Sequence, residues 1–255
     1  MTDPEILAQI RDNITHESPA ARNDPVGYHF FVDCEEDPDG LFSHEPHDVA
    51  CVRRFHLDFG VPSRSPAEGS ADLRLYPKAE RDLRQRLITE EALGQGEMLD
   101  SLRKGDRVGV ADGIADVLYV AAGTEVQLGL IRPTLLGNTA QADAVAGLLG
   151  VAMGNLRFAL QTTLDVSSSD ILAQALLQLR IICNGLGMEL AIPVRAVFDE
   201  VHRSNMSKKN ADGSITRDAG GKIIKSPHYS PADIEGVLAA FRTNDGCRVV
   251  QHHPV

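Results

Sequence analysis

RLITEEALGQGEMLDSLRKGDRVGVADGIADVLYV, at residues 86–120, decides the fold of this chain. It contains two neighbouring helical patterns rich in aliphatic residues, separated by a short polar break at 103–106. We expect helices over 78–102 and 108–130. Helices joined by so short a connection tend to pack antiparallel. With 43% hydrophobic residues, no Trp and few aromatic residues, the composition favours aliphatic helix packing over a β-sandwich.

Two groups of acidic residues lie on these two helical patterns. Glu90, Glu91 and Glu97 belong to the first, and Asp112 and Asp116 to the second. Antiparallel packing would bring both groups to one end of a shared groove. Carboxylates gathered in one place repel each other unless a cation lies among them, and hard oxygen ligands suit Mg²⁺ or Mn²⁺. Two solvated acidic faces are the alternative, but the surrounding apolar residues indicate core-packed helices and favour a metal site.

Four segments together resemble the MazG-like, all-α nucleoside triphosphate pyrophosphohydrolases. They are VRRFHLDFGVP (52–62), RLITEE (86–91), VADGIADVLYVAAGTEVQLGL (110–130) and FDEVHRSNMSKKNADGSITRDAGGKIIKSPHYSP (198–231), in the family's order. The resemblance points to the branch common in phages, which is related to phosphoribosyl-ATP pyrophosphohydrolase and to the MazG-like dUTPases.

This resemblance implies a bundle of four to five helices with additional helices, and a homo-oligomer, either dimer or tetramer. It also implies hydrolysis of a nucleoside triphosphate to a monophosphate and pyrophosphate, with Mg²⁺ or Mn²⁺. Purine deoxynucleotides, dGTP or dATP, are weakly favoured. A dUTP- or dCTP-directed enzyme, a phosphoribosyl-ATP hydrolase and a non-catalytic nucleotide-binding bundle are the alternatives.

We expect the following roles for residues of this chain. The metal ligands are Glu90, Glu91, Glu97, Asp112 and Asp116, and the three glutamates also take part in catalysis. The substrate-binding residues are His56, Tyr119, Asn205, Lys208 and Lys225. Of these, Asn205, Lys208 and Lys225 are expected to hold phosphate oxygens, and His56 and Tyr119 to line the base site.

The first acidic motif departs from the family pattern at Gly94, where a third glutamate is expected. Removing residues 94–96 restores the pattern, so we interpret them as an insertion that displaces this glutamate to Glu97. Two glycines in a helix interior cost about 1 kcal/mol each relative to alanine, which favours a bulge or kink. An unbroken helix would separate Glu90 from Glu97 by about 10 Å along its axis, too far to share one ion.

The second acidic motif departs from the family pattern at Gly113, which replaces an acidic residue. Asp112 is the candidate replacement, because Asp112 and Asp116 are four residues apart and share a helix face.

The charge of the chain limits its partners. A net charge of −11 argues against binding to nucleic acid or to a membrane surface, both of which need a basic patch. A local basic run supplies cations for a nucleotide; its members are Lys208, Lys209, Arg217, Lys222 and Lys225. Four dispersed cysteines, no signal pattern and no apolar run near the ~20 residues of a membrane span indicate the cytoplasm, or the host cytoplasm if the chain is phage-encoded.

We expect one domain over 1–255, with an irregular N-terminal extension at 1–45 and a helix at 45–59. A helical insertion at 135–190, with helices at 140–163 and 169–185, adds to the bundle or to a dimer interface. A phosphate-binding tail follows at 199–232. His44 and His47 lie close to metal-ligand spacing, but without a second His/Cys pair nearby the sequence does not predict zinc there.

Overall fold

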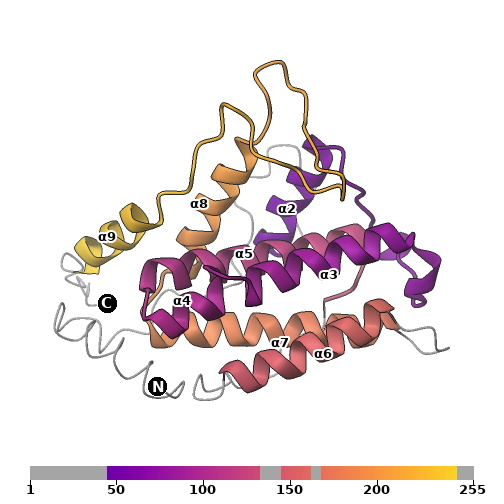
Figure 1. The fold of residues 1–255 in the computed structure, drawn as a ribbon, viewed down its shortest axis with the longest axis horizontal. Coiled ribbons are helices and arrows are strands. Elements are labelled where there is room, and N and C mark those ends of the chain that lie inside the picture. Colours follow the sequence, from indigo (N-terminus) through magenta and orange to yellow (C-terminus); the bar gives the residue numbers. More distant parts are fainter. Residues whose placement is uncertain (1–44, 133–144, 162–167, 246–255) are drawn as a thin grey trace, which may run out of the picture.

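The computed structural model of the chain describes residues 45–132, 145–161 and 168–245 (Figure 1). These residues form helices and connecting loops without a strand, which confirms the all-α prediction. The expected N-terminal extension lies outside the described residues, apart from Glu45, and so do both ends of the helix expected at 140–163.

The α-helices follow one another in the order shown in Figure 1. Their bounds are α2 His47–Asp58, α3 Lys78–Leu93, α4 Met98–Lys104, α5 Arg107–Leu128, α6 Val145–Gln161, α7 Ser168–Glu189, α8 Val194–Met206 and α9 Ile234–Asp245. Two short 3₁₀ turns, Pro66–Glu68 and Leu73–Leu75, lie in the connection between α2 and α3.

Helix α5 is the centre of the bundle. It contacts α2, α3, α4, α7, α8 and α9, and it is buried on nearly every side. A helix that is apolar all round belongs in a core, and the many alanines and glycines of α5 let its neighbours approach closely. Two of its polar residues, Asp112 and Asp116, are half-buried among packed helices and do not lie on a solvated face.

The first acidic helix, expected over 78–102 with a bulge or kink at 94–96, is divided in two at that point. Helix α3 ends at Leu93, and α4 begins only at Met98. In the linker, Gly96 has a φ of +86°, a left-handed conformation that glycine adopts without strain. The inserted residues therefore break the helix completely. Glu97 becomes the N-cap residue of α4.

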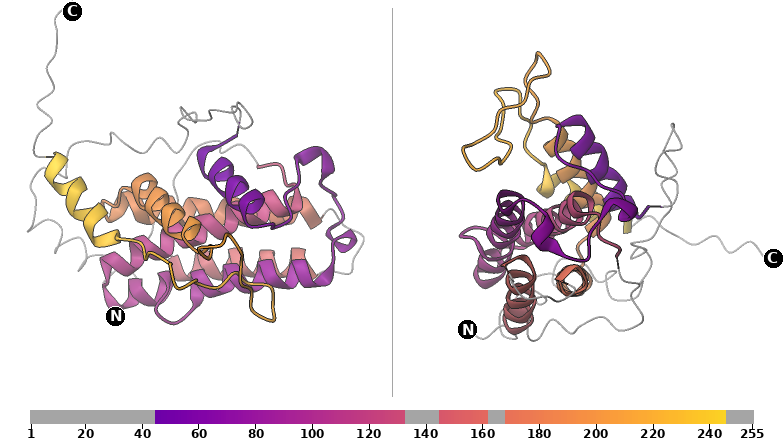
Figure 2. Two further views of the ribbon diagram at one scale, coloured as in Figure 1. Left: turned by 90° about the horizontal axis from the view of Figure 1, so that it is seen from above. Right: turned by 90° about the vertical axis from the view of Figure 1, so that its right-hand side faces the viewer.

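The helical insertion packs onto the bundle. Helices α6 and α7 contact each other, α7 also contacts α5, and α6 contacts α3 (Figures 1 and 2). Helix α7 is long and apolar enough to cross a membrane by length and composition, contrary to the expectation that no such run exists. However, 61% of its most apolar window is buried inside the protein, as expected of a core helix.

Candidate active site

Five acidic side chains line one cleft between α3, α4, α5 and α8. Its acidic residues are Glu90, Glu91, Glu97, Asp112 and Asp116, the set singled out from the sequence. The loop after α8 closes the other side of the cleft with basic residues. The cleft has a volume of about 610 Å³, within the range of about 300–1,000 Å³ that is usual for small-molecule sites.

Three of the five carboxylates form a close cluster. One oxygen from each of Glu91, Glu97 and Asp116 lies within 4.8 Å of the others. They come from three different elements: Glu91 from α3, Glu97 from the start of α4, and Asp116 from α5. Asp112 and Glu90 line the same cleft outside this cluster. An all-oxygen set of this kind fits a hard divalent cation such as Mg²⁺ or Mn²⁺.

The electrostatics of the cluster favour a cation. Burial and the neighbouring Glu97 carboxylate raise the pKa of Glu91 to about 7. Burial, together with Glu91 and Asp112, raises the pKa of Asp116 well above its ordinary value. The pKa of Glu97 is raised by burial and by Asp112. The fold therefore holds these carboxylates where their negative charges repel each other, and a bound cation would relieve that repulsion.

Gly113 explains how Glu97 reaches the cluster. A Cβ atom on Gly113 would lie 2.6 Å from the Cα of Met98, so only glycine allows the start of α4 to approach α5 this closely. Met98 follows Glu97 directly and is fully buried. The two departures from the family pattern are thus linked. The break that begins at Gly94 makes α4 a separate helix, and Gly113 allows the start of α4 to pack directly against α5.

Glu90 lies outside the close cluster and forms an ion pair with Lys222. Its carboxylate accepts a hydrogen bond from Lys222 at 2.6 Å, and its side chain is 43% exposed. Lys222 belongs to the loop that runs from α8 to α9. That loop is tied to the bundle by Arg217, which donates to the Phe59 carbonyl at 2.7 Å, and by Arg86, which donates to the Gly220 carbonyl at 3.2 Å.

The basic side of the cleft holds the residues expected to bind phosphate. Asn205 and Lys208, at the end of α8 and just after it, line the acidic cleft and also a second, apolar pocket. Burial lowers the pKa of Lys208, while Asp116 acts in the opposite direction. Lys225 lines only the acidic cleft, with its ammonium group 4.5 Å from the centre of the Tyr229 ring.

The apolar pocket contains both residues expected at the base site. Tyr119 packs edge-on against Phe55, and its hydroxyl lies 3.1 Å from Nδ1 of His202. His56 donates from Nδ1 to the Pro62 carbonyl at 2.8 Å, which leaves Nε2 as the acceptor. Burial lowers the pKa of His56 to about 3, so the ring is neutral at physiological pH.

Residues 52–142 match the family model of phosphoribosyl-ATP pyrophosphohydrolase. These residues form a MazG-like domain. No curated protein and no solved structure matches the chain. The matched segment covers most of α2 and all of α3, α4 and α5, and thus all five acidic residues of the cleft. It supports a nucleotide pyrophosphohydrolase of the MazG-like type.

The MazG-like domain also contains a site residue that the sequence analysis missed. Arg84 is buried in α3 and lines the apolar pocket, and its Nε has no hydrogen-bond partner among the described residues. Burial lowers its pKa to about 10. An arginine in an amphipathic helix normally lies on the solvated face, so only the packing of α3 against α5 reveals its burial. Lys222, a member of the basic run of the sequence, lines both cavities.

Proposed function

We propose that the chain hydrolyses a purine deoxynucleoside triphosphate, dGTP or dATP, to the monophosphate and pyrophosphate. The observation that carries this proposal is the junction of two cavities. The acidic cleft and the apolar pocket share Glu91, Asp116, Asn205, Lys208 and Lys222 as a common wall. A nucleotide placed across this wall has its base in the apolar pocket and its phosphates in the acidic cleft.

The oxygen cluster of Glu91, Glu97 and Asp116 would hold Mg²⁺ or Mn²⁺, with Asp112 and Glu90 beside it. Such an ion, when bound, screens the phosphates and makes a water molecule more acidic. A glutamate of the cleft that does not bind the ion accepts the proton of the attacking water.

The basic residues position the triphosphate. Lys208 and Lys222 are partly buried and lie between the acidic cleft and the apolar pocket, where the first phosphate of a bound nucleotide falls. Lys225 is exposed and lines the acidic cleft but not the apolar pocket, so it would contact the phosphates that leave as pyrophosphate. A lysine ammonium group attracts phosphate as a point charge. These residues therefore bind any nucleoside triphosphate more tightly than a monophosphate, whatever its base.

The base is recognised by two polar groups in the apolar pocket. A Cβ atom on Gly123 would lie 2.9 Å from Nη1 of Arg84 and 3.3 Å from Nε2 of His56, so both groups meet at this glycine. The guanidinium offers donors and the neutral imidazole an acceptor. Guanine presents two acceptors, O6 and N7, on one edge, and arginine pairs with both. We therefore favour dGTP over dATP.

Phosphoribosyl-ATP is the second candidate substrate, because the family model that matches residues 52–142 carries that name. The test is pyrophosphate release with Mg²⁺ or Mn²⁺ from dGTP, dATP, dCTP, dUTP and phosphoribosyl-ATP. The highest kcat/KM for a purine deoxynucleotide supports the proposal. The highest value for phosphoribosyl-ATP replaces it with the second candidate, and binding without turnover of any of them would identify a non-catalytic nucleotide-binding bundle.

Arg84→Met tests the role of the arginine in the same assay. Methionine keeps the apolar volume but removes the donors, and a bidentate arginine–guanine pair contributes about 1–3 kcal/mol of discrimination. The preference for dGTP over dATP should therefore fall by about tenfold. A loss of activity with the preference unchanged would assign Arg84 to folding and not to base recognition.

We also propose that the protein is a homo-oligomer, a dimer or a tetramer, as the resemblance implies. Light scattering coupled to gel filtration measures its mass directly.

A further inference from the structure

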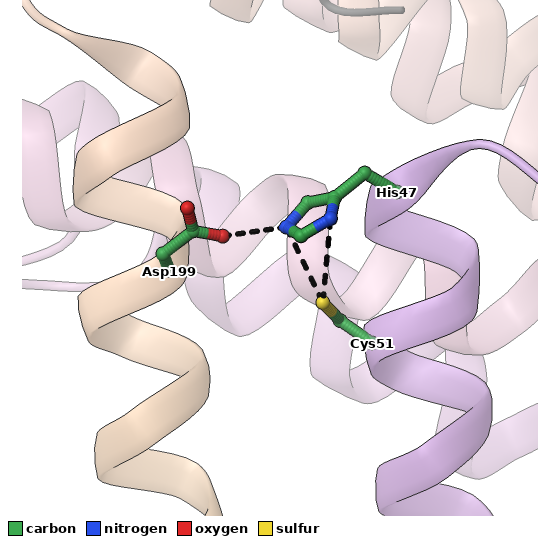
Figure 3. A group of neighbouring side chains, drawn as sticks. All are labelled: His47, Cys51 and Asp199. Carbon is green, nitrogen blue, oxygen red and sulfur yellow. Dashed lines mark hydrogen bonds and ion pairs between the residues drawn. The ribbon is translucent and has the colours of Figure 1, made fainter. Parts of the chain in front are cut away.

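A second cluster of potential metal ligands lies between α2 and α8. It consists of His47 and Cys51 on α2 and Asp199 on α8 (Figure 3). His47 and Cys51 are four residues apart and therefore lie on one face of their helix. That face is turned toward α8, where Asp199 completes the group. None of the three lines the acidic cleft or the apolar pocket.

The three side chains converge on one nitrogen. Nε2 of His47 lies 2.6 Å from Oδ1 of Asp199 and 3.4 Å from Sγ of Cys51, and all three potential ligand atoms lie within 4.8 Å of one another. Ligand atoms around a tetrahedral Zn²⁺ lie about 3.3–3.7 Å apart, given Zn–N, Zn–O and Zn–S bonds of about 2.0–2.3 Å. For an ion at these bond lengths to enter, the histidine–aspartate contact has to lengthen by about 0.7 Å, whereas the histidine–cysteine distance already lies in this range.

The chemistry of this set differs from that of the acidic cleft. A thiolate and an imidazole are soft or borderline ligands, which favour Zn²⁺ over Mg²⁺. Thiolate and carboxylate together neutralise the charge of a divalent ion. Three protein ligands leave a fourth position for water in tetrahedral coordination.

Arg195 competes with an ion at this position. Its guanidinium lies 2.9 Å from Nδ1 of His47 and donates to Oδ2 of Asp199 at 3.0 Å. With Nδ1 as the acceptor, Nε2 carries the proton and donates to Asp199. A metal ion can bind Nε2 only after Nε2 has lost its proton. The neutral ring is then protonated on Nδ1 instead. Arg195 therefore has to release Nδ1, which its exposed position permits: its side chain is 36% exposed.

We propose that His47, Cys51 and Asp199 form a binding site for a divalent cation of the zinc class, distinct from the magnesium-type cluster in the cleft. The ion would join α2 to α8. Phe55 and His56, about one turn beyond Cys51 on α2, and Asn205 on α8 line the same apolar pocket. An ion between these helices would thus brace two walls of that pocket and stabilise the fold.

Cobalt substitution tests this site directly. The full chain is freed of metal with a chelator and titrated with Co²⁺ in excess Mg²⁺, which occupies the oxygen cluster. We expect one equivalent of Co²⁺ to give a near-ultraviolet thiolate-to-cobalt absorption band that Zn²⁺ removes. Cys51→Ser should abolish the band. It should also weaken Zn²⁺ binding by more than about 100-fold, because loss of a residue that only supports a ligand already costs about 10- to 100-fold. Arg195→Gln should tighten binding.

Matched variants separate this site from other thiols and from the cleft. Cys183→Ser and the double variant Cys34→Ser/Cys247→Ser should retain the band, and Zn²⁺ should raise the Tm of Asp116→Asn as it does that of the wild type. Asp199→Asn gives a second ligand variant at a partly exposed position if Cys51→Ser does not fold. The absence of the band from the wild type, its persistence in Cys51→Ser, or weaker binding by Arg195→Gln would overturn the proposal.

Discussion

At the scale of single residues, the cleft is governed by charges that the fold keeps close together. Asp116 is surrounded by buried apolar residues of α5, and its pKa is raised well above its ordinary value by burial, by Glu91 and by Asp112. Such a carboxylate destabilises the folded protein unless a cation or a proton neutralises its charge. The Lys208 ammonium faces it from the loop after α8, and burial lowers the pKa of that lysine.

Asp116→Asn should abolish turnover and leave the helical circular-dichroism signal nearly unchanged. Because the substitution removes one of several repelling charges, the Tm measured without metal should stay the same or rise. Asp82→Asn, which changes an exposed residue of α3, is the matched control and should keep its activity. Loss of fold together with activity in Asp116→Asn would mean that this carboxylate is structural.

Lys208→Ala should lower kcat/KM by a similar factor for dGTP, dATP, dCTP and dUTP, because a phosphate carries no information about the base. The comparison is with Lys78→Ala, on an exposed lysine at the start of α3, which should leave all four values unchanged. A changed ranking of the four bases, without a common loss, would show that Lys208 contacts the base.

At the scale of the elements, the break between α3 and α4 and the contact between α4 and α5 act together. The linker at 94–97 turns the chain so that Met98 packs directly onto Gly113. Glu97 is thereby placed beside Glu91 and Asp116, whereas an unbroken helix would carry it about 10 Å away from Glu90 along the axis. The loop after α8 covers the same end of the bundle, and its Lys222 bridges to Glu90.

Gly113→Ala should therefore disturb both stability and activity. Its Cβ would overlap the backbone of Met98, and overpacking of a core costs about 1–3 kcal/mol. Displacement of α4 should also move Glu97 and lower kcat/KM by tenfold or more, which is about 1.4 kcal/mol. The control is Gly147→Ala in α6, where a Cβ meets nothing within 4 Å and a gain of about 0.5–1 kcal/mol is expected. Urea unfolding and steady-state kinetics measure both effects; unchanged kinetics in Gly113→Ala would separate the α4–α5 contact from the site.

At the scale of the whole molecule, two buried features join distant parts of the chain. Asp48 of α2 and Glu125 of α5 accept hydrogen bonds from Arg132 and from Arg180 of α7. Although burial would raise it, the pKa of Asp48 is held far below its ordinary value by the two arginines. This network connects the helical insertion to the bundle. Neutral histidines, His56 buried and His202 half-buried, are the second feature: burial lowers the pKa of His202 to about 4 and that of His56 to about 3.

The buried His56 predicts a loss of stability in acid. Below a pH of about 6.5 the unfolded chain binds a proton at this histidine, while the folded protein does not until about pH 3. The unfolded state thus binds more protons across this window, so the free energy of unfolding falls as the pH falls, by up to about 1.4 kcal/mol per pH unit.

Urea unfolding of the wild type and of His56→Asn at a series of pH values from 7 to 4 tests this prediction. The asparagine amide keeps a donor for the Pro62 carbonyl but does not titrate. The difference between the two proteins isolates His56 from the acidic cluster, whose raised pKa values act in the opposite direction. His228→Asn, at an exposed site, should follow the wild type. Identical pH slopes for wild type and His56→Asn would contradict a neutral buried His56.

The sequence by itself determined the helical class of the protein, the positions of most helices and the acidic composition of the cleft. Helix periods and glycine stops are local, so α2, α5 and α7 lie close to where their patterns predict them. The five carboxylates are near one another in the chain and lie on helices joined by short links, so their meeting in one cleft followed from chain connectivity. The roles assigned to them remain predictions.

Only the tertiary structure decided which side chains meet across the bundle. The sequence did not decide whether the helix ends before Glu97, because two glycines weaken a helix without ending it. The close approach at Gly113 depends on Met98, which belongs to another helix. The burial of Arg84 and the convergence of His47 and Cys51 with Asp199 depend on packing between helices up to 152 residues apart. Periodicity predicts which face of a helix is buried, but not which helix covers it, and such long-range contacts are therefore visible only in the folded chain.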